Sequence, residues 1–180
     1  QLHDAGLRYV RIALQSGRAD AHDWLVGLPG ASARVTKALA SCARGPLDLE
    51  AEVTLTRPTA PLLLETISYL VRHGVGAIHL RLLERRGPAA DDYIALAPRL
   101  ALLQPLLEDA VQQALRHGVQ VRLSGLPLCA APSFPECHLP AEAIRWALPP
   151  GLATPEPSRA QIGCPGCPGP PRCSGAPAHY

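Results

Sequence analysis

Methionine is absent from the 180-residue sequence, and lysine occurs only as Lys37. The sequence also lacks 18 consecutive apolar residues, which excludes a conventional membrane-spanning helix. It has no basic segment followed by an apolar core and a small-residue cleavage site, so we expect a cytoplasmic protein without a membrane partner. The net charge of +2 is too small to favour nucleic-acid binding.

The start of the sequence also lacks a feature that complete proteins have. No methionine stands at position 1, and the pattern of residues 1–6 is typical of the C-terminal end of a helix. We therefore expect the chain to be part of a longer one.

Two common functional motifs are missing as well. The sequence contains neither a glycine-rich phosphate-binding loop nor a Ser-His-Asp motif. What remains is a chain with 47% hydrophobic and 18% charged residues. This composition excludes a disordered protein and permits a sizeable core.

The composition changes sharply near residue 125. Thirteen of the 20 prolines lie in the last 55 residues, where hydrophobic periodicity fades. We therefore divide the chain into a core of residues 1–125 and a Pro/Cys-rich tail of residues 126–180.

The core alternates strand and helix patterns. Runs rich in Val, Leu and Ile predict four strands. Between them, apolar residues recur at helical spacing, and glycines such as Gly74 and Gly118 stand where a helix would end before the next strand. The predicted strands are Leu7–Leu14, Leu47–Thr56, Val75–Leu83 and Val119–Leu123. This alternation predicts an α/β fold with parallel strands, either an open sheet or a partial barrel.

Helix boundaries follow from capping residues and prolines. Ser32 is expected to cap a helix whose apolar stripe includes Leu39 and Cys42, which makes Cys42 a buried small hydrophobe. Pro61 is expected in the first turn of the next helix, where proline is tolerated, and a further apolar stripe is expected from Pro105 onward.

The sharpest local motif is the C-x2-C-x5-C run of Cys164, Cys167 and Cys173. Short loops that return thiolates to one point suit a zinc ion or an iron–sulfur cluster. Three thiolates need a fourth ligand or leave an open site, and the available donors are Cys129 and Cys137, followed by His138 and His179. We favour a cluster, while zinc and incidental thiols in a proline-rich tail remain alternatives.

Some polar residues in the core also stand out. His22 and Asp23 lie in an expected loop after the first strand, where they either serve a ligand or pin the loop. Glu50 and Glu52 alternate on one face of the second strand, which is costly unless they contact a ligand or an arginine. Arg81, near the end of the third strand, could meet an anionic substrate or lie in solvent.

Several of these segments resemble radical S-adenosylmethionine (radical SAM) enzymes. The tail, with Gly175 and Tyr180 after the last cysteine, resembles the auxiliary-cluster segment of SPASM or twitch-type members. Cys129 stands just beyond a strand, where such proteins often place a further cluster ligand. The core segments that carry the likeness are residues 4–14, His22-Asp23, Gly27-Leu28-Pro29-Gly30, and Leu55-Thr56-Arg57-Pro58 with Glu65-Thr66.

The resemblance implies a fold, an activity and cofactors. The fold would be a partial parallel (βα) barrel, of which four βα units are visible. A complete enzyme of this kind would use a [4Fe-4S] cluster to cleave S-adenosylmethionine reductively, and the resulting 5′-deoxyadenosyl radical would abstract hydrogen from a peptide or small-metabolite substrate. A reductant such as ferredoxin or flavodoxin would supply the electron.

The sequence departs from the family in ways that bear on its site. The C-x3-C-x2-C loop that holds the catalytic cluster is absent, so the chain alone is expected to be inactive. Ala13 stands where many relatives have a serine facing the ribose, which leaves Gln15 or Ser16 as substitutes. With Glu52 and Arg81, these two are our expected cofactor-binding residues, while the catalytic residues stay unassigned.

The expected auxiliary cluster also departs from the family pattern. The usual next cysteine after Cys173 is missing, so Cys129 would have to join Cys164, Cys167 and Cys173 at one metal site. Cys137 is the substitute if Cys129 points inward. The alternative function is a non-catalytic α/β binding module with a structural zinc knuckle in its tail.

Overall fold

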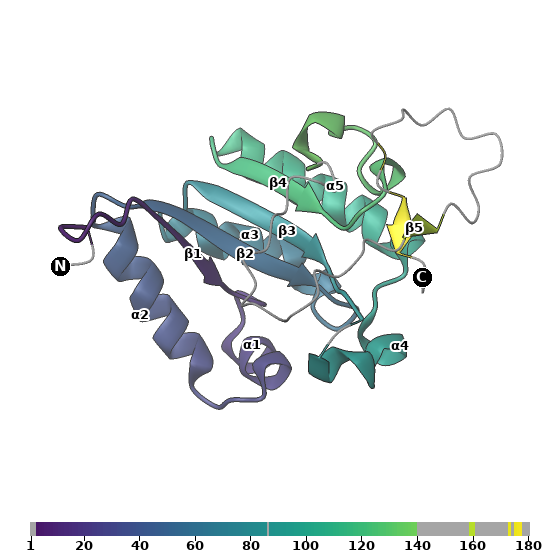
Figure 1. Ribbon diagram of the computed structural model, residues 1–180, viewed down its shortest axis with the longest axis horizontal. Helices are drawn as coiled ribbons and strands as arrows, with labels where there is room; N and C mark the ends of the chain where they lie inside the picture. The colour runs from purple at the N-terminus through teal and green to yellow at the C-terminus, as the bar shows by residue number, and fades with distance from the viewer. Residues whose placement is uncertain (1–2, 86, 140–158, 161–172, 174, 178–180) are drawn as a thin grey trace, which may run out of the picture.

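A computed structural model describes residues 3–85, 87–139, 159–160, 173 and 175–177 of the chain. The described elements form a four-stranded parallel sheet in the order β1-β2-β3-β4, with helices between the strands (Figure 1). The strands are β1 (Tyr9–Ala13), β2 (Asp48–Leu55), β3 (Ala77–Leu82) and β4 (Gln120–Ser124). The α/β class, the four strands and their parallel order are therefore confirmed.

The described residues also form five α-helices and four short 3-10 helices. These are α1 (Ala19–Val26), α2 (Ala31–Ala43), η1 (Ala60–Leu62), α3 (Leu63–Arg72), η2 (Gly87–Ala90), α4 (Tyr93–Leu96), α5 (Leu100–Arg116), η3 (Leu128–Ala130) and η4 (Pro135–Cys137). Two short strands, β5 (Arg159–Ala160) and β6 (Ala176–Pro177), form a separate antiparallel pair. No helix of the described part of the chain is both long enough and apolar enough to cross a membrane.

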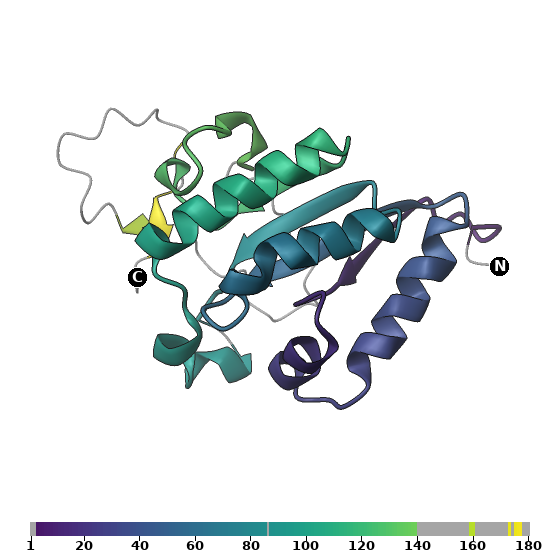
Figure 2. The ribbon, with the colours of Figure 1, turned by 180° about the vertical axis from the view of Figure 1, so that it is seen from behind.

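All the long helices cover the same face of the sheet. Helices α3 and α5 lie behind the strands in Figure 1 and in front of them in Figure 2, where α2 lies on the same side. Each crossover steps one strand further in the same direction, and right-handed crossovers of this kind place every helix on one face. The opposite face carries no helix of the described chain.

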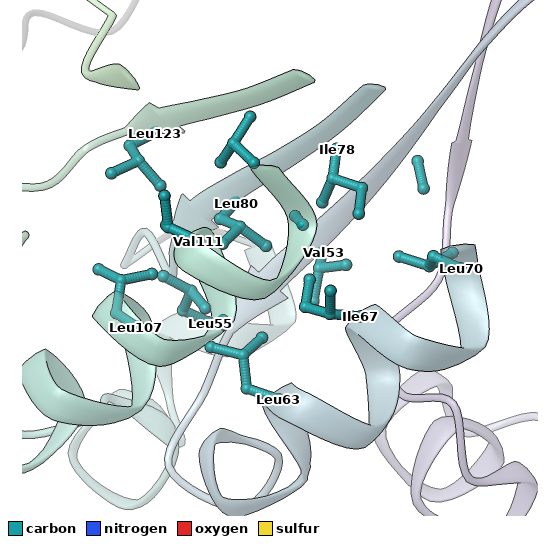
Figure 3. Packing of buried hydrophobic residues seen from close by; sticks show 14 of the residues in the cluster. Val53, Leu55, Leu63, Ile67, Leu70, Ile78, Leu80, Leu107, Val111 and Leu123 are labelled. Atoms are coloured by element: carbon teal, nitrogen blue, oxygen red, sulfur yellow. The ribbon is translucent and has the colours of Figure 1, made fainter. Parts of the chain in front are cut away.

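The hydrophobic core lies between the sheet and helices α3 and α5 (Figure 3). Alternate residues of each strand point towards these helices, including Val53 and Leu55 on β2 and Ile78 and Leu80 on β3. Ile67 on α3 packs among them and is fully buried. The packed core runs past residue 125, because Leu126, Ala130, Ala131 and Cys137 are buried in it too.

Two predicted helix starts are wrong. The N-cap position of α2 is Gly30 rather than Ser32, and the side-chain acceptor for the first N–H groups is the carboxylate of Asp23 in α1, described below. Helix α5 begins at Leu100 and contains Pro105 in its interior. The buried Leu103 continues the apolar stripe on the N-terminal side of the proline, and this packing outweighs the lost backbone hydrogen bond. Cys42 is half-buried against the core, as expected for a small hydrophobe.

The loop after β1 is locked against α3 at Gly17. The Gly17 N–H donates to Thr66 Oγ1 at 3.0 Å, and a Cβ on Gly17 would lie 2.9 Å from Tyr69 Cβ. Only glycine allows the loop to approach α3 this closely. The contact fixes the path of the chain after β1.

Truncation of Ile67 tests the packing of α3. We expect Ile67→Ala to lower the free energy of unfolding by about 2–5 kcal/mol, because it leaves a cavity in a closely packed core. The matched control is Leu64→Ala on the same helix, where the side chain is partly exposed and the loss should stay below about 1 kcal/mol. Urea unfolding followed by circular dichroism measures both. Equal losses in the two variants would contradict the packing described here.

Candidate functional site

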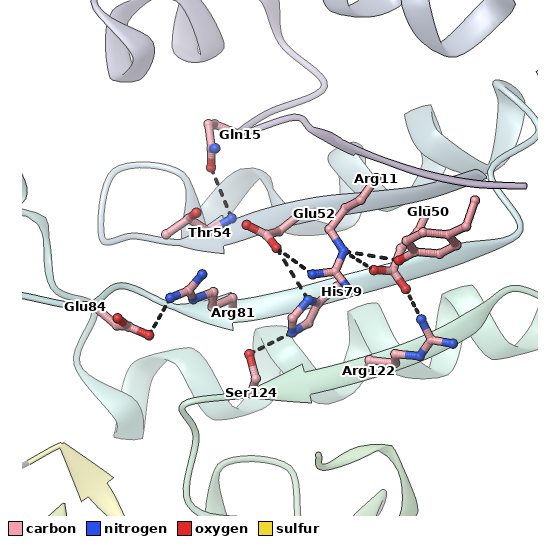
Figure 4. Close-up of polar contacts among 11 residues, drawn as sticks. Arg11, Gln15, Glu50, Glu52, Thr54, His79, Arg81, Glu84, Arg122 and Ser124 are labelled. Carbon is pink, nitrogen blue, oxygen red and sulfur yellow. Dashed lines mark hydrogen bonds and ion pairs between the residues drawn. The ribbon is translucent and has the colours of Figure 1, made fainter. Parts of the chain in front are cut away.

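The helix-free face of the sheet is lined by charged and polar side chains from all four strands (Figure 4). They occupy the positions between the core-facing residues, because successive side chains on a strand point to opposite faces. We call this set the polar face: Arg11 on β1, Glu50, Glu52 and Thr54 on β2, His79 and Arg81 on β3, and Arg122 and Ser124 on β4.

Glu50 is the deepest charge on the polar face. Its side chain is 0% exposed and forms ion pairs with Arg11 and Arg122. Arg122 comes from β4 and reaches Glu50 across β3, where the small Ala77 lies opposite Glu50 in register. A ligand or an arginine is expected beside these carboxylates; the structure places an arginine beside Glu50 and also beside Glu52, whose Oε2 atom lies 3.4 Å from Arg11 Nη1.

Glu52 continues this network towards the carboxyl ends of the strands. Its Oε2 atom lies 3.5 Å from His79 Nδ1, and its side chain is 20% exposed. Contact with the His79 ring is the main cause of the lowered pKa of Glu52. Burial opposes this shift, and the charges of Arg81 and Arg11 lower the pKa further. Glu52 is therefore a carboxylate at neutral pH.

His79 joins Glu52 to Ser124 within the sheet. The His79 ring is buried, and its Nε2 atom lies 2.7 Å from Ser124 Oγ. Three side chains from three adjacent strands thus form one line of polar contacts, Glu52 to His79 to Ser124. Sequence reasoning missed His79, Arg122 and Ser124, although their alternation with buried apolar residues on β3 and β4 was a usable signal.

The four expected cofactor-binding residues are only partly brought together. Glu52 and Arg81 belong to the polar face, and Gln15, in the loop after β1, lies beside it in Figure 4. Gln15 Oε1 accepts a hydrogen bond from the Thr54 N–H at 3.1 Å, and Arg81 Nη2 lies 2.5 Å from Glu84 Oε1. Ser16 is buried, and its Oγ accepts the Arg18 N–H at 3.1 Å, which gives it a role in the turn. A role of these residues towards a cofactor stays a prediction.

His22 and Asp23 lie in helix α1 rather than in a loop, because the chain turns into a helix immediately after Arg18. His22 is buried, and its Nδ1 accepts a hydrogen bond from the Gln15 N–H at 3.0 Å. Asp23 caps α2 from outside that helix, accepting the N–H groups of Gly30 at 2.6 Å and Ser32 at 2.7 Å. Both residues therefore hold neighbouring backbone in place, which is the structural role considered for them above rather than a role towards a ligand.

These contacts set the ionisation of both residues. Hydrogen bonds from Ser32 and then Gly30 lower the pKa of Asp23. Burial lowers the pKa of His22, with the nearby Asp23 charge opposing it. Neutral His22 is also the form whose Nδ1 can accept the Gln15 hydrogen bond.

The tail cysteines are described in part. Cys173 Sγ accepts a hydrogen bond from the Leu128 N–H at 3.4 Å, which brings the tail back to η3, the 3-10 helix that contains the exposed Cys129. Cys137 is buried in the core, and burial raises the pKa of its thiol. Cys164 and Cys167 lie outside the described residues, and within the described part no three His, Cys, Asp or Glu side chains are grouped to hold a metal ion.

A cleft of about 300 Å³ opens on a different part of the molecule, between η1 and the first turns of α5. It contains none of the residues of the polar face and none of the expected metal ligands. Its lining is mainly apolar with two arginines at the rim: Arg57, Ala60, Pro98, Arg99, Leu102, Leu103 and Leu106.

Comparison of the chain with protein-family models and with curated proteins finds no match.

The buried ion pairs of Glu50 lead to a stability prediction. Glu50→Gln should lower the free energy of unfolding by about 1–3 kcal/mol, because it leaves Arg11 and Arg122 without their shared carboxylate. Asp20→Asn is the matched control, since it breaks a solvent-exposed pair with Arg18 and should leave the free energy of unfolding almost unchanged. Chemical unfolding at pH 7 measures both, and a Glu50 variant as stable as the wild type would contradict the pairing.

Burial of His22 predicts a pH dependence of stability. Because its pKa is lower in the folded chain than in the unfolded one, its contribution is complete above about pH 6.5 and is lost as the pH falls below that value. His22→Asn keeps an acceptor for the Gln15 N–H but cannot be protonated. Unfolding free energies measured between pH 8 and pH 5 should fall more steeply for the wild type than for the variant. Parallel curves would contradict this assignment.

Proposed function

We propose that this chain is the C-terminal part of a radical SAM enzyme, with the polar face as the inner wall of a partial (βα) barrel and an auxiliary [4Fe-4S] cluster in the tail. The observation that carries the proposal is the return of Cys173 to the segment of Cys129 at the end of β4. That contact supports a single site for two of the four expected ligands, although 44 positions separate them in the sequence.

The one-sided arrangement of the helices supports the barrel part of the proposal. In a (βα) barrel, every helix lies outside the sheet and the inner face of the strands receives the ligand. Here α2, α3 and α5 share one side, and the other side carries charged side chains of both signs. A sheet wound on both faces, as in dinucleotide-binding folds, would have helices on each side instead.

The donor set in the tail fits an iron–sulfur cluster better than it fits a hard cation. Thiolates are the usual ligands of such clusters, and backbone N–H groups that donate to sulfur tune them. The Leu128 N–H already donates to Cys173 Sγ. Cys129, Cys164, Cys167 and Cys173 would hold the cluster, which when bound would supply electron transfer or a point of attachment for substrate.

Residues of the polar face would bind and orient the substrate. The buried Glu50 pairs hold Arg11 and Arg122 in place, so the polar face presents fixed charges to a peptide or small-metabolite substrate. Arg81 and Gln15, near the carboxyl ends of β3 and β1, would orient its polar groups. Hydrogen abstraction from the substrate would use S-adenosylmethionine at a cluster loop that this sequence does not contain, with a reductant such as ferredoxin or flavodoxin.

Iron binding tests the proposal. After anaerobic reconstitution with iron and sulfide, the chain should absorb near 400 nm and contain about four iron atoms and acid-labile sulfide. Separate Cys→Ala changes at Cys129, Cys164, Cys167 and Cys173 should each remove more than half of the iron. Cys42→Ala and Cys137→Ala are matched controls that should retain it, because both side chains pack against the core.

Two outcomes would overturn the assignment. Stoichiometric zinc without sulfide would favour a non-catalytic α/β binding module with a zinc knuckle. Iron kept by Cys129→Ala and lost by Cys137→Ala would show that the fourth ligand is Cys137.

A further inference from the structure

The cleft between η1 and the start of α5 lies at the end of the sheet where α/β proteins bind ligands. One of its lining residues, Arg57, follows the carboxyl end of β2, which ends at Leu55. Its volume of about 300 Å³ is at the lower end of the range of small-molecule sites. The cleft shares no residue with the polar face or with the expected cluster ligands, so the proposed function gives it no role.

The lining of the cleft is aliphatic apart from two arginines. Ala60 and Leu103 are buried, whereas Leu102 lines the same cleft and is 66% exposed. Covering such a side chain with a hydrocarbon group removes apolar surface from water, which is favourable. The lining therefore favours a ligand with a hydrocarbon body.

The two arginines give the cleft a positive charge. Arg57 Nε donates to Ala97 O at 3.1 Å, which holds the guanidinium on the segment before α5 and leaves its Nη atoms for a ligand. Arg99 is the N-cap residue of α5, and the first turn of this helix contains no acidic residue. Among the described residues, neither arginine is paired with a carboxylate. The charge of the cleft therefore favours an anion.

The donor groups of the cleft suit a carboxylate better than a phosphate. The planar fork of a guanidinium matches the two oxygens of a carboxylate. A phosphate has more acceptor oxygens, and its sites commonly add a glycine-rich loop or a hydroxyl group. The lining residues include no glycine, serine or threonine.

The volume of the cleft limits the size of the ligand. Because a water-sized group occupies about 30 Å³ in a liquid, the cleft accommodates about ten non-hydrogen atoms. We propose that it binds a small carboxylic acid with a hydrocarbon body of about eight carbon atoms. The carboxylate contacts Arg57 and Arg99, and the hydrocarbon lies against Leu102, Leu103 and Leu106. This site goes beyond the proposed function and does not rest on it.

Binding of octanoate to the full chain tests the proposal. Isothermal titration calorimetry measures the affinity, and amide chemical shifts of ¹⁵N-labelled protein locate the site. We expect saturable binding, with the largest shifts at Ala60 and in the first turn of α5. Octanoate should bind at least about tenfold more tightly than acetate, because its methylene groups are buried. Octylamine has the same chain length but a positive charge, and it should not compete with octanoate.

Surface variants test the charge and the apolar lining separately. Arg99→Glu should weaken octanoate binding about tenfold or more, and Arg57→Gln should weaken it at least about threefold. Leu102→Ser should reduce the preference for octanoate over butanoate. Arg34→Glu is the matched control, because it makes the same charge change at an exposed position in α2 and should leave the affinity within about twofold of the wild type. Leu102 and Arg99 are both exposed, so their variants should keep the wild-type fold.

The measurements also distinguish the proposed ligand from other occupants. The absence of saturable octanoate binding, or shifts that lie outside the cleft, would overturn the proposal. Equal losses in Arg34→Glu and Arg99→Glu would show only a general attraction of anions. Tighter binding of octyl phosphate than of octanoate would contradict the choice of a carboxylate. A dimer that Leu102→Ser dissociates would show that a second copy of the chain covers the cleft. A failure of iron binding would overturn the proposed function alone.

Discussion

The buried carboxylate of Glu50 imposes the constraint around which the polar face is organised. A charge without access to water must be paired, and Glu50 meets this requirement with arginines from β1 and β4. Arg11 lies opposite Glu50 in register on β1, whereas Arg122 must reach Glu50 from β4 across β3, so the pairing of one carboxylate depends on the register of all four strands. Ala77 on β3 leaves the room that Arg122 needs.

The side chains on the two faces of the sheet are stabilised by different interactions. On the helix side, apolar residues of α3 and α5 fill the space over the strands, and the stabilisation comes from removal of hydrocarbon from water. On the polar face, charges of opposite sign neutralise one another. Parallel sheets usually have both faces covered, so a parallel sheet with helices on one face only leaves the other available for a ligand or for further chain.

The loop after β1 connects the core to the polar face. Gly17 seats this loop on α3, His22 holds it from α1, and Gln15 ties it to β2. Asp23 then fixes the start of α2. The carboxyl end of β1 is thus held by hydrogen bonds from several elements, which gives the polar residues there fixed positions.

The sequence by itself determined the α/β class, the four strands and their parallel order, because strand and helix periodicities are local and the right-handed crossover leaves few alternatives. It also indicated that the Glu50 and Glu52 carboxylates needed partners. Only the tertiary structure decided which arginines pair with Glu50, that His79 lies between Glu52 and Ser124, and that Asp23 rather than Ser32 caps α2. These contacts join residues that are distant in the chain or in different elements, and their partners depend on strand register and side-chain reach. No local pattern encodes either of these quantities.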